Sequence, residues 1–522
     1  MGRMPEPDDP RAPGEGTGEA AATDAPVSGG FAVEAPGPRQ WTGWILGPAA
    51  LLVTLLLPPP EGLSIEGWRT AGAGGLMAVF WITEPIPIPA TALLPLVLFP
   101  LLGLADIDEA AAPFANPVIF LFLGGFVIAL AMERWHLHRR VAVGLIALMG
   151  TRPPAIVAGF LLASALVSMW VSNTATALMM LPIALSVARL VPAERASTPE
   201  LRDFGTVIVL AVAYGATSGG MATLIGTPPN ALLRGYLDET YGLVLDMGQW
   251  MLLGVPMMLV TLPAVYLVLT RVMFTLGRQE LPGMSALIAA ERGRLGRLRG
   301  PELAVAVVFA LTAAAWVGRP LLARLLPLVS DTTIAIAGAL LLFVIPVNLR
   351  RGTFVMSWES TARIPWGVLL LFGGGLSLAS RIDRHGLSAY LGGLAGGLDG
   401  LPMLLLLGLV CFGILLLTEL TSNTATAATF LPITGALAVS LGQNPLLFLI
   451  PTALAANCSY MMPVGTPPNA IVYGSGLVTL PQMARAGLLL NVTLVPVLVG
   501  LLLLLGPMVF GVEIDVVPEW AR

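Results

Sequence analysis

Two hexapeptides each occur twice in this 522-residue chain, in the same order, and this duplication constrains the fold more than any other feature. Ser-Asn-Thr-Ala-Thr-Ala begins at Ser172 and again at Ser422, and Gly-Thr-Pro-Pro-Asn-Ala begins at Gly226 and again at Gly465. The copies lie 250 and 239 residues apart, so both motifs recur in register. The chain is therefore predicted to contain two copies of one structural unit.

The composition places this duplicated unit in a membrane. Apolar residues, counted as Ala, Val, Ile, Leu, Met, Phe, Trp, Tyr and Cys, make up 56% of the chain, and charged residues only 11%. About a quarter of the residues in an average soluble domain are charged. This excludes a disordered chain, a basic nucleic-acid-binding protein and most soluble enzymes, and it predicts an all-α polytopic membrane protein. All basic residues are Arg, and a Lys-free chain rich in Ala, Gly and Pro indicates a bacterial inner-membrane protein.

Arginine-rich loops orient the apolar segments, because basic loops favour the cytoplasmic side of a membrane. The loop 271–299 contains six Arg and two Glu, so we place it inside, and we place the acidic C-terminal end outside. This predicts a cytoplasmic N-terminus and two repeats of inverted topology. Four arginines fall on the outer side against the rule, namely Arg319, Arg324, Arg381 and Arg384. The predicted order is a disordered cytoplasmic tail (1–40), a first transmembrane helix (41–70), repeat 1 (71–277), a cytoplasmic Arg-rich linker (278–300), repeat 2 (301–512) and an extracytoplasmic tail (513–522).

Two apolar segments, 154–190 and 401–441, are too long for one crossing and carry the Ser-Asn-Thr motifs near their middle. A single helix over the first would be about 55 Å long, against about 30 Å of hydrocarbon. Each segment is predicted to be a re-entrant hairpin with the motif at its tip, since Ser and Asn are good N-caps. About eleven transmembrane helices remain. The alternative is two ordinary crossings per segment, which the charges do not exclude.

The Gly-Thr-Pro-Pro-Asn motifs interrupt two further apolar segments, at about 205–235 and about 445–475. A broken helix exposes carbonyl groups, which suit a hard cation such as Na+, and N–H groups, which suit an anion. Inverted repeats with broken helices are typical of secondary transporters. A lone Ser-Asn-Thr could instead serve interhelical hydrogen bonding, but its duplication beside each Pro-Pro pair favours a binding site. The residues predicted to break the helices are Pro228, Pro229, Pro467 and Pro468.

Paired Ser-Asn-Thr motifs, each followed by a Thr-Pro-Pro motif, resemble the divalent anion–sodium symporters, which include sodium/dicarboxylate, sodium/citrate and sodium/sulfate cotransporters. The resemblance covers residues 41–512. It implies a homodimer in which each protomer has a scaffold domain and a transport domain that moves as an elevator. It implies one sodium site at Ser168, Ser172, Asn173 and the Gly226 backbone, and another at Thr418, Ser422, Asn423 and the Gly465 backbone. It implies substrate contacts from Asn173, Thr174, Thr227, Asn423, Thr424 and Thr466.

The leading hypothesis is a Na+-coupled symporter of a small di- or tricarboxylate of the succinate, malate or fumarate type. The motifs contain no basic residue, so bound Na+ and helix dipoles must balance the charge of the anion. The alternatives are a dicarboxylate exchanger, a sodium/sulfate symporter, an arsenite or sodium–proton carrier, and a channel. The apolar segments contain no HExxH or GxSxG motif, so we expect no enzyme activity. Two co-transported Na+, the anion, the bilayer and a second copy of the chain are the expected ligands and partners, with no nucleic acid.

Glu419 lies next to Thr418 inside an apolar segment. Ionisable residues inside a membrane are functional candidates because burying them is costly. Two roles remain open at this point: a proton-linked or tuning role, and that of a hydrogen-bonded structural acid.

Overall fold

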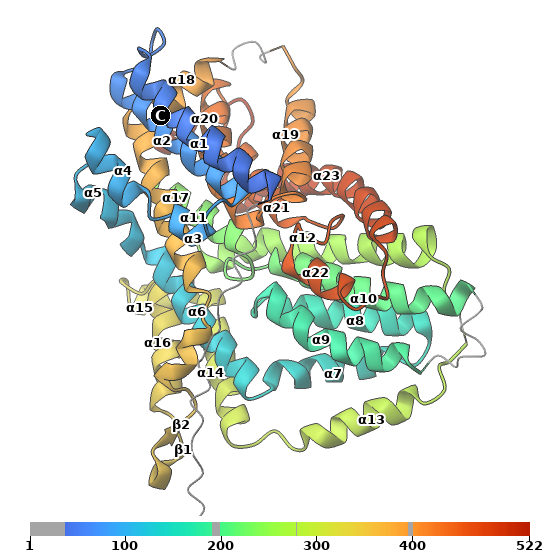
Figure 1. Cartoon of the computed structure of the whole chain (residues 1–522). Helices are drawn as coiled ribbons and strands as arrows, with labels where there is room; N and C mark the ends of the chain where they lie inside the picture. Colours follow the sequence, from blue (N-terminus) through green and yellow to red (C-terminus); the bar gives the residue numbers. More distant parts are fainter. Residues whose placement is uncertain (1–36, 191–198, 278, 395–399, 522) are drawn as a thin grey trace, which may run out of the picture.

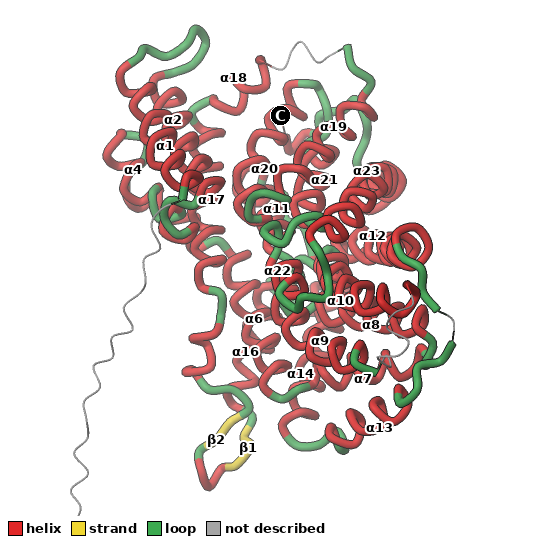
Figure 2. The backbone as a smooth tube through the Cα atoms, turned by 45° about the vertical axis from the view of Figure 1, so that its right-hand side comes forward, coloured by secondary structure: helices red, strands yellow, loops and turns green. Residues whose placement is uncertain are grey.

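Helices account for nearly all regular structure in the computed structural model, which describes residues 37–190, 199–277, 279–394 and 400–521 (Figure 1). In the described ranges the only strands are β1 (Pro346–Asn348) and β2 (Thr353–Phe354), which pair antiparallel at one end of the molecule (Figure 2). The helices of the first half are α1 (Pro38–Leu56), α2 (Ile65–Thr83), α3 (Ile88–Thr91), α4 (Pro95–Leu102), α5 (Ile107–Ala111), α6 (Pro117–Arg134), α7 (Leu137–Met149), α8 (Pro153–Ser168), α9 (Asn173–Ala188), α10 (Pro199–Gly220), α11 (Pro228–Tyr241) and α12 (Met247–Leu267). Those of the second half are α13 (Met284–Leu295), α14 (Pro301–Val317), α15 (Arg319–Leu325), α16 (Asp331–Val344), α17 (Trp366–Arg384), α18 (Leu387–Leu394), α19 (Met403–Thr418), α20 (Asn423–Ser440), α21 (Leu446–Asn457), α22 (Pro467–Tyr473) and α23 (Leu480–Phe510).

Three helical segments in the described residues are long and apolar enough, by length and composition alone, to cross a membrane: Ile107–Arg134, Met247–Met273 and Leu480–Phe510. A fourth appears if α14 and α15, which meet at 81°, count as one span. Six shorter apolar helices accompany them, including three of the four helices that flank the Ser-Asn-Thr motifs, namely α8, α9 and α19. The total of about eleven crossings therefore stays a prediction.

The two halves of the chain repeat the same local pattern around the duplicated motifs. In each half a helix ends shortly before Ser-Asn-Thr and a new helix begins at its Asn, at Asn173 and at Asn423. In each half a new helix also begins at the first Pro of Thr-Pro-Pro. The preceding threonines, Thr227 and Thr466, have nearly identical extended backbones, with φ/ψ of −148°/143° and −150°/143°. Pro is favoured at the first helical position, because its missing N–H would be unpaired there in any case.

At the N-terminal end, the helices begin and end at other residues than the predicted segments do. The tail was placed at 1–40, but Pro38 already begins α1; residues 1–36 lie outside the described residues. The first transmembrane helix was placed at 41–70, but α1 ends at Leu56, before three successive prolines. The next helix, α2, begins at Ile65, where the Ser64 hydroxyl accepts a hydrogen bond from the Gly67 N–H at 2.9 Å. The prolines that follow α1 and the Ser64 cap at the start of α2 thus set these two boundaries more sharply than hydropathy does.

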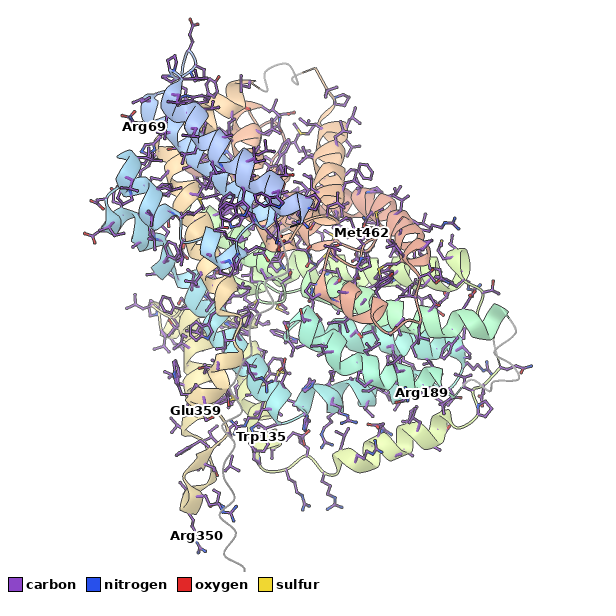
Figure 3. All side chains as sticks on the ribbon, viewed as in Figure 1. Arg69, Trp135, Arg189, Arg350, Glu359 and Met462 are labelled. Carbon is purple, nitrogen blue, oxygen red and sulfur yellow. The ribbon has the colours of Figure 1, made fainter. Side chains whose placement is uncertain are left out.

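The arginine clusters predicted to be cytoplasmic lie together at one end of the molecule. This end carries α13 and the β1–β2 hairpin, and the C-terminus lies at the opposite end (Figures 1 and 2). Figure 3 shows Arg350, Glu359 and Trp135 toward the same end. Ion pairs join α7 to α13 and α14, and α6 to the segment before α17: Arg139–Glu291, Arg140–Glu302 and Arg363–Glu133.

Three of the four arginines that break the charge rule have acidic partners. Arg381 and Arg384 of α17 both pair with Glu109 of α5, at 3.0 and 3.1 Å. Arg319 of α15 pairs with Asp246, which precedes α12. A paired arginine is partly neutralised by its carboxylate, which gives a physical reason why these side chains do not follow the general trend.

Helices α8 and α10 pack with their backbones in close approach. A Cβ at Gly215 would lie 2.5 Å from the Leu161 carbonyl oxygen, and a Cβ at Gly219 would overlap the Ala165 carbonyl. Small residues at helix interfaces in membrane proteins allow two helix backbones to come this close to each other. The first hairpin, which consists of α8 and α9, is therefore packed tightly against the first broken helix, which consists of α10 and α11.

A buried ion pair connects α11 to α16, and we expect its loss to destabilise the protein. The Arg234 Nη1 lies 3.4 Å from the Asp331 Oδ2, which also accepts a hydrogen bond from the Met247 N–H at 2.9 Å. Replacing Asp331 by Asn leaves a buried guanidinium without a counter-charge, which costs about 3–5 kcal/mol. The measurement is the midpoint of thermal unfolding of the detergent-purified protein. The double variant Arg234→Met/Asp331→Asn should recover part of the loss, and a midpoint below that of Asp331→Asn would contradict this account.

Candidate functional site

One cavity of about 590 Å³ brings both copies of both motifs together. Its wall combines the start of α9 with the start of α20, and the start of α11 with the start of α22. Helix N-termini carry partial positive charge, so four of them around one cavity favour an anion; free N–H groups at the first positions come only from α9 and α20, because α11 and α22 begin with two prolines each. The predicted residues in the wall are Ser172, Asn173, Thr174, Gly226, Thr227, Pro228, Ser422, Asn423, Thr424, Gly465, Thr466 and Pro467.

The remaining predicted residues lie behind this wall. Ser168 and Thr418 end α8 and α19 and are fully buried. Each contacts the Asn of its own motif, which lies five residues later. The second prolines of the two breaks, Pro229 and Pro468, are buried in α11 and α22 and do not line the cavity.

The first candidate cation environment gathers oxygen atoms around Asn173. The Ser168 hydroxyl donates to the Asn173 Oδ1 at 2.6 Å. The Ser172 hydroxyl caps α9 by accepting from the Ala175 N–H at 3.2 Å. The Asn173 side chain also lies against Gly220 at the end of α10, where a Cβ would come within 2.7 Å of its oxygen.

The second candidate environment gathers the matching residues around Asn423, but here the amide nitrogen, not the oxygen, faces the hydroxyl. The Thr418 hydroxyl lies 2.7 Å from the Asn423 side-chain amide and donates to the Ala456 carbonyl at 2.7 Å. With its nitrogen turned toward these acceptors, the amide also donates to the Gly465 carbonyl at 3.1 Å. Carbonyl, hydroxyl and amide oxygens so grouped are the ligand types that hard cations prefer.

Comparison with known proteins identifies the family. The model described as the sodium:sulfate symporter transmembrane region matches residues 39–512. The chain belongs to this family. The sodium-dependent dicarboxylate transporter SdcS of Staphylococcus saprophyticus is 41% identical over 482 residues, which cover 91% of this chain and 93% of that protein. SdcS of Staphylococcus aureus strain USA300 is 41% identical over 483 residues, with the same two coverages.

A solved structure shares the fold at much lower sequence similarity. The YdaH transporter of Alcanivorax borkumensis, described as having an unusual topology, aligns with a TM-score of 0.55 and 14% identity. The alignment covers 90% of this chain and 99% of that one. Together with the family match, this confirms the predicted resemblance and the all-α polytopic membrane class.

In this member of the symporter family, the final Asn of each Thr-Pro-Pro-Asn motif holds the loop that precedes it. The Asn230 amide donates to the Gly220 and Thr223 carbonyls at 3.2 and 2.9 Å. The Asn469 amide donates to the Ser459 and Met462 carbonyls at 3.2 and 3.1 Å. Sequence reasoning assigned these two residues no role, although their place inside a duplicated motif was a usable signal.

Asn457, at the end of α21, links the two halves of the site. Its amide donates to the Thr217 carbonyl of α10 at 2.9 Å, and its Oδ1 accepts from the Thr227 hydroxyl at 2.7 Å. Its side chain is completely buried. Nothing in the sequence marked this residue, since it lies outside the duplicated hexapeptides.

The cavity wall contains two charged side chains among the described residues, Glu133 at the end of α6 and Arg363 before α17. They form an ion pair at 2.8 Å. The duplicated motifs still contribute no basic residue. Arg363 was missed as a wall residue because only its membership of an Arg cluster was visible in the sequence.

Proposed function

We propose that this protein couples Na+ to the transport of a small dicarboxylate, of the succinate, malate or fumarate type, across the bacterial inner membrane. The observation that carries the proposal is the convergence of four helix N-termini and two oxygen-rich Asn environments on one cavity. The SdcS relatives are sodium-dependent dicarboxylate transporters by name, which supports both the sodium and the dicarboxylate. The substrate carboxylates would contact Asn173, Thr174, Thr227, Asn423, Thr424 and Thr466.

Coupling follows from the charges of the wall. A dicarboxylate carries about two negative charges, and the duplicated motifs offer only partial positive charge from helix dipoles. Two Na+ would supply the balance, one near Ser168, Ser172, Asn173 and Gly226 and the other near Thr418, Ser422, Asn423 and Gly465. Binding of the anion would then depend on binding of the cations, which is the thermodynamic requirement for symport.

The wall also supports an elevator mechanism. One side of the cavity comes from the motif-bearing helices and the other from α6 and the segment before α17. We propose that the motif-bearing helices form the transport domain and that α6 and α17 belong to the scaffold of a homodimer. With the N-terminus inside and the C-terminus outside, Glu133 and Arg363 would mark the cytoplasmic side of the cavity.

The deciding experiment is uptake of labelled succinate into proteoliposomes under an inward Na+ gradient, compared with a matched K+ gradient. Accumulation only with Na+ supports the proposal. Uptake that does not depend on Na+ but requires dicarboxylate inside the proteoliposomes would show that the protein is an exchanger. Unlabelled sulfate and citrate serve as competitors, and Na+-driven flux of sulfate without flux of succinate would assign it to the sulfate branch that the family description names.

A further inference from the structure

Glu419 is a buried carboxylate, and in the described residues its two oxygens accept hydrogen bonds from five residues. Its side chain is 3% exposed. Backbone N–H groups of three successive residues reach its two oxygens, from Tyr460 at 2.8 Å, Met461 at 2.9 and 3.0 Å, and Met462 at 2.9 Å. The Ser459 hydroxyl donates at 3.0 Å and the Asn491 amide of α23 at 2.8 Å. Such charge-assisted bonds are roughly twice as strong as neutral ones.

All of these donors except Asn491 belong to the loop that breaks the second helix. Residues 458–466 separate α21 from α22, and Figure 3 shows Met462 in the middle of the molecule. The backbone of Glu419 also lies against Gly465: a Cβ added to Gly465 would be 3.1 Å from the carbonyl oxygen of Glu419. Gly465 is the residue whose carbonyl faces Asn423. Glu419 therefore ties the tip of the second hairpin, the broken-helix loop and α23 to one another.

The equivalent position in the first half has no charge. At the motif spacing of 250 residues, Glu419 corresponds to Met169. There the loop is held by neutral bonds, with the Thr223 hydroxyl donating to the Met169 carbonyl at 2.5 Å and the Trp250 indole donating to the Met221 carbonyl at 3.0 Å. The duplication has kept the motifs but not this carboxylate.

We propose that Glu419 is the positioning residue of the second cation site, and that it makes the two cation sites unequal. It orients the loop that presents the Gly465 carbonyl, and its negative charge next to Thr418 favours a cation there. The first site, with Met169 at the matching position, relies on neutral oxygens alone. This inference rests on the proposed function, because it assumes a cation at each Asn. Since each hydrogen-bond partner found for the carboxylate in the described residues is a donor, the geometry favours this role over a proton-linked one.

The test is Glu419→Gln, which keeps the shape of the side chain and removes its charge. Two readouts are needed, the Na+ dependence of succinate uptake and the Na+ dependence of thermal unfolding in the absence of succinate. We expect half-saturating Na+ to rise about tenfold in both, which corresponds to about 1.4 kcal/mol. Half-saturating succinate at saturating Na+ should change much less. Glu302→Gln, which alters another hydrogen-bonded glutamate outside the cavity wall, is the matched control.

The outcomes separate cleanly. Unchanged Na+ dependence in both readouts, or a shift in half-saturating succinate alone, would overturn the role of Glu419. Should Glu419→Gln fail to fold, Glu419→Asp keeps the charge and shortens its reach; it should shift the Na+ midpoint in the same direction by a smaller factor, and no shift would again overturn the role. Na+-independent uptake by the unaltered protein would refute the proposed function, while the unfolding readout would still report on the cation site.

Discussion

Replacing Asn423 by Ala is expected to lower Na+-driven succinate uptake by about two orders of magnitude, and Asn173→Ala should have the same effect. Each side chain is proposed to contact both a cation and the anion. Hydrogen bonds to charged groups contribute about 1.5–3 kcal/mol each, so two lost contacts exceed the 2.7 kcal/mol that corresponds to about a hundredfold. Initial uptake rates in proteoliposomes measure the effect, normalised to the amount of reconstituted protein.

Asn348→Ala is the matched control for these two variants. Asn348 is exposed in β1 and accepts a hydrogen bond from the Arg351 N–H, far along the chain from either motif. Its replacement should leave uptake within about twofold, since surface substitutions change free energies by about 0.5 kcal/mol or less. Near-normal Na+-driven uptake by Asn173→Ala would refute a site that uses both halves of the chain.

Replacing Gly226 by Ala should reduce uptake about ten- to a hundredfold through packing alone. The added Cβ would lie 2.5 Å from the Gly220 carbonyl oxygen and 3.0 Å from the Gly220 Cα. Both atoms belong to the backbone, so no side-chain rotation relieves the clash, and the loop before α11 must shift. Overpacking of this kind costs about 1–3 kcal/mol, and here it displaces a proposed cation ligand. The same uptake assay applies.

Gly500→Ala controls for the general effect of adding a methyl group to a glycine. Gly500 lies inside α23, where a Cβ would meet nothing within 4 Å. Ala is the better helix former by about 1 kcal/mol, so this variant should unfold at the same or a higher temperature with unchanged uptake. Equal activity of Gly226→Ala and Gly500→Ala would show that the first loop tolerates displacement.

The parts of the site that could be predicted are those set by local sequence. Pro228 and Pro467 each begin a helix. Pro is favoured at the first helical position, because the N–H that it lacks would have no partner within the helix there. Ser172 caps α9 through its own neighbours in sequence. The doubling of both motifs then predicted that they would meet, and the cavity wall contains both copies of each.

The parts that could not be predicted depend on contacts between distant segments. Asn457 bonds to Thr217 and Thr227, which are 240 and 230 residues away in the chain. Glu419 was visible as an ionisable residue, but its role depends on Asn491 and on the loop beyond α21. Three of the four arginines that break the charge rule are explained only by Glu109 and Asp246, which lie beside them in the structure. None of these pairings leaves a periodic or motif signal.

The close approach of α8 and α10 has a mechanical consequence. Because Gly215 and Gly219 leave no gap between the two backbones, neither helix can rotate or slide against the other without a collision. A displacement of the first hairpin therefore moves α10, and with it the Gly226 loop that follows α10, together with the hairpin. The proposed cation ligands on the two segments would keep their mutual spacing throughout such a displacement, so that an ion bound there would be carried along rather than released by the motion itself.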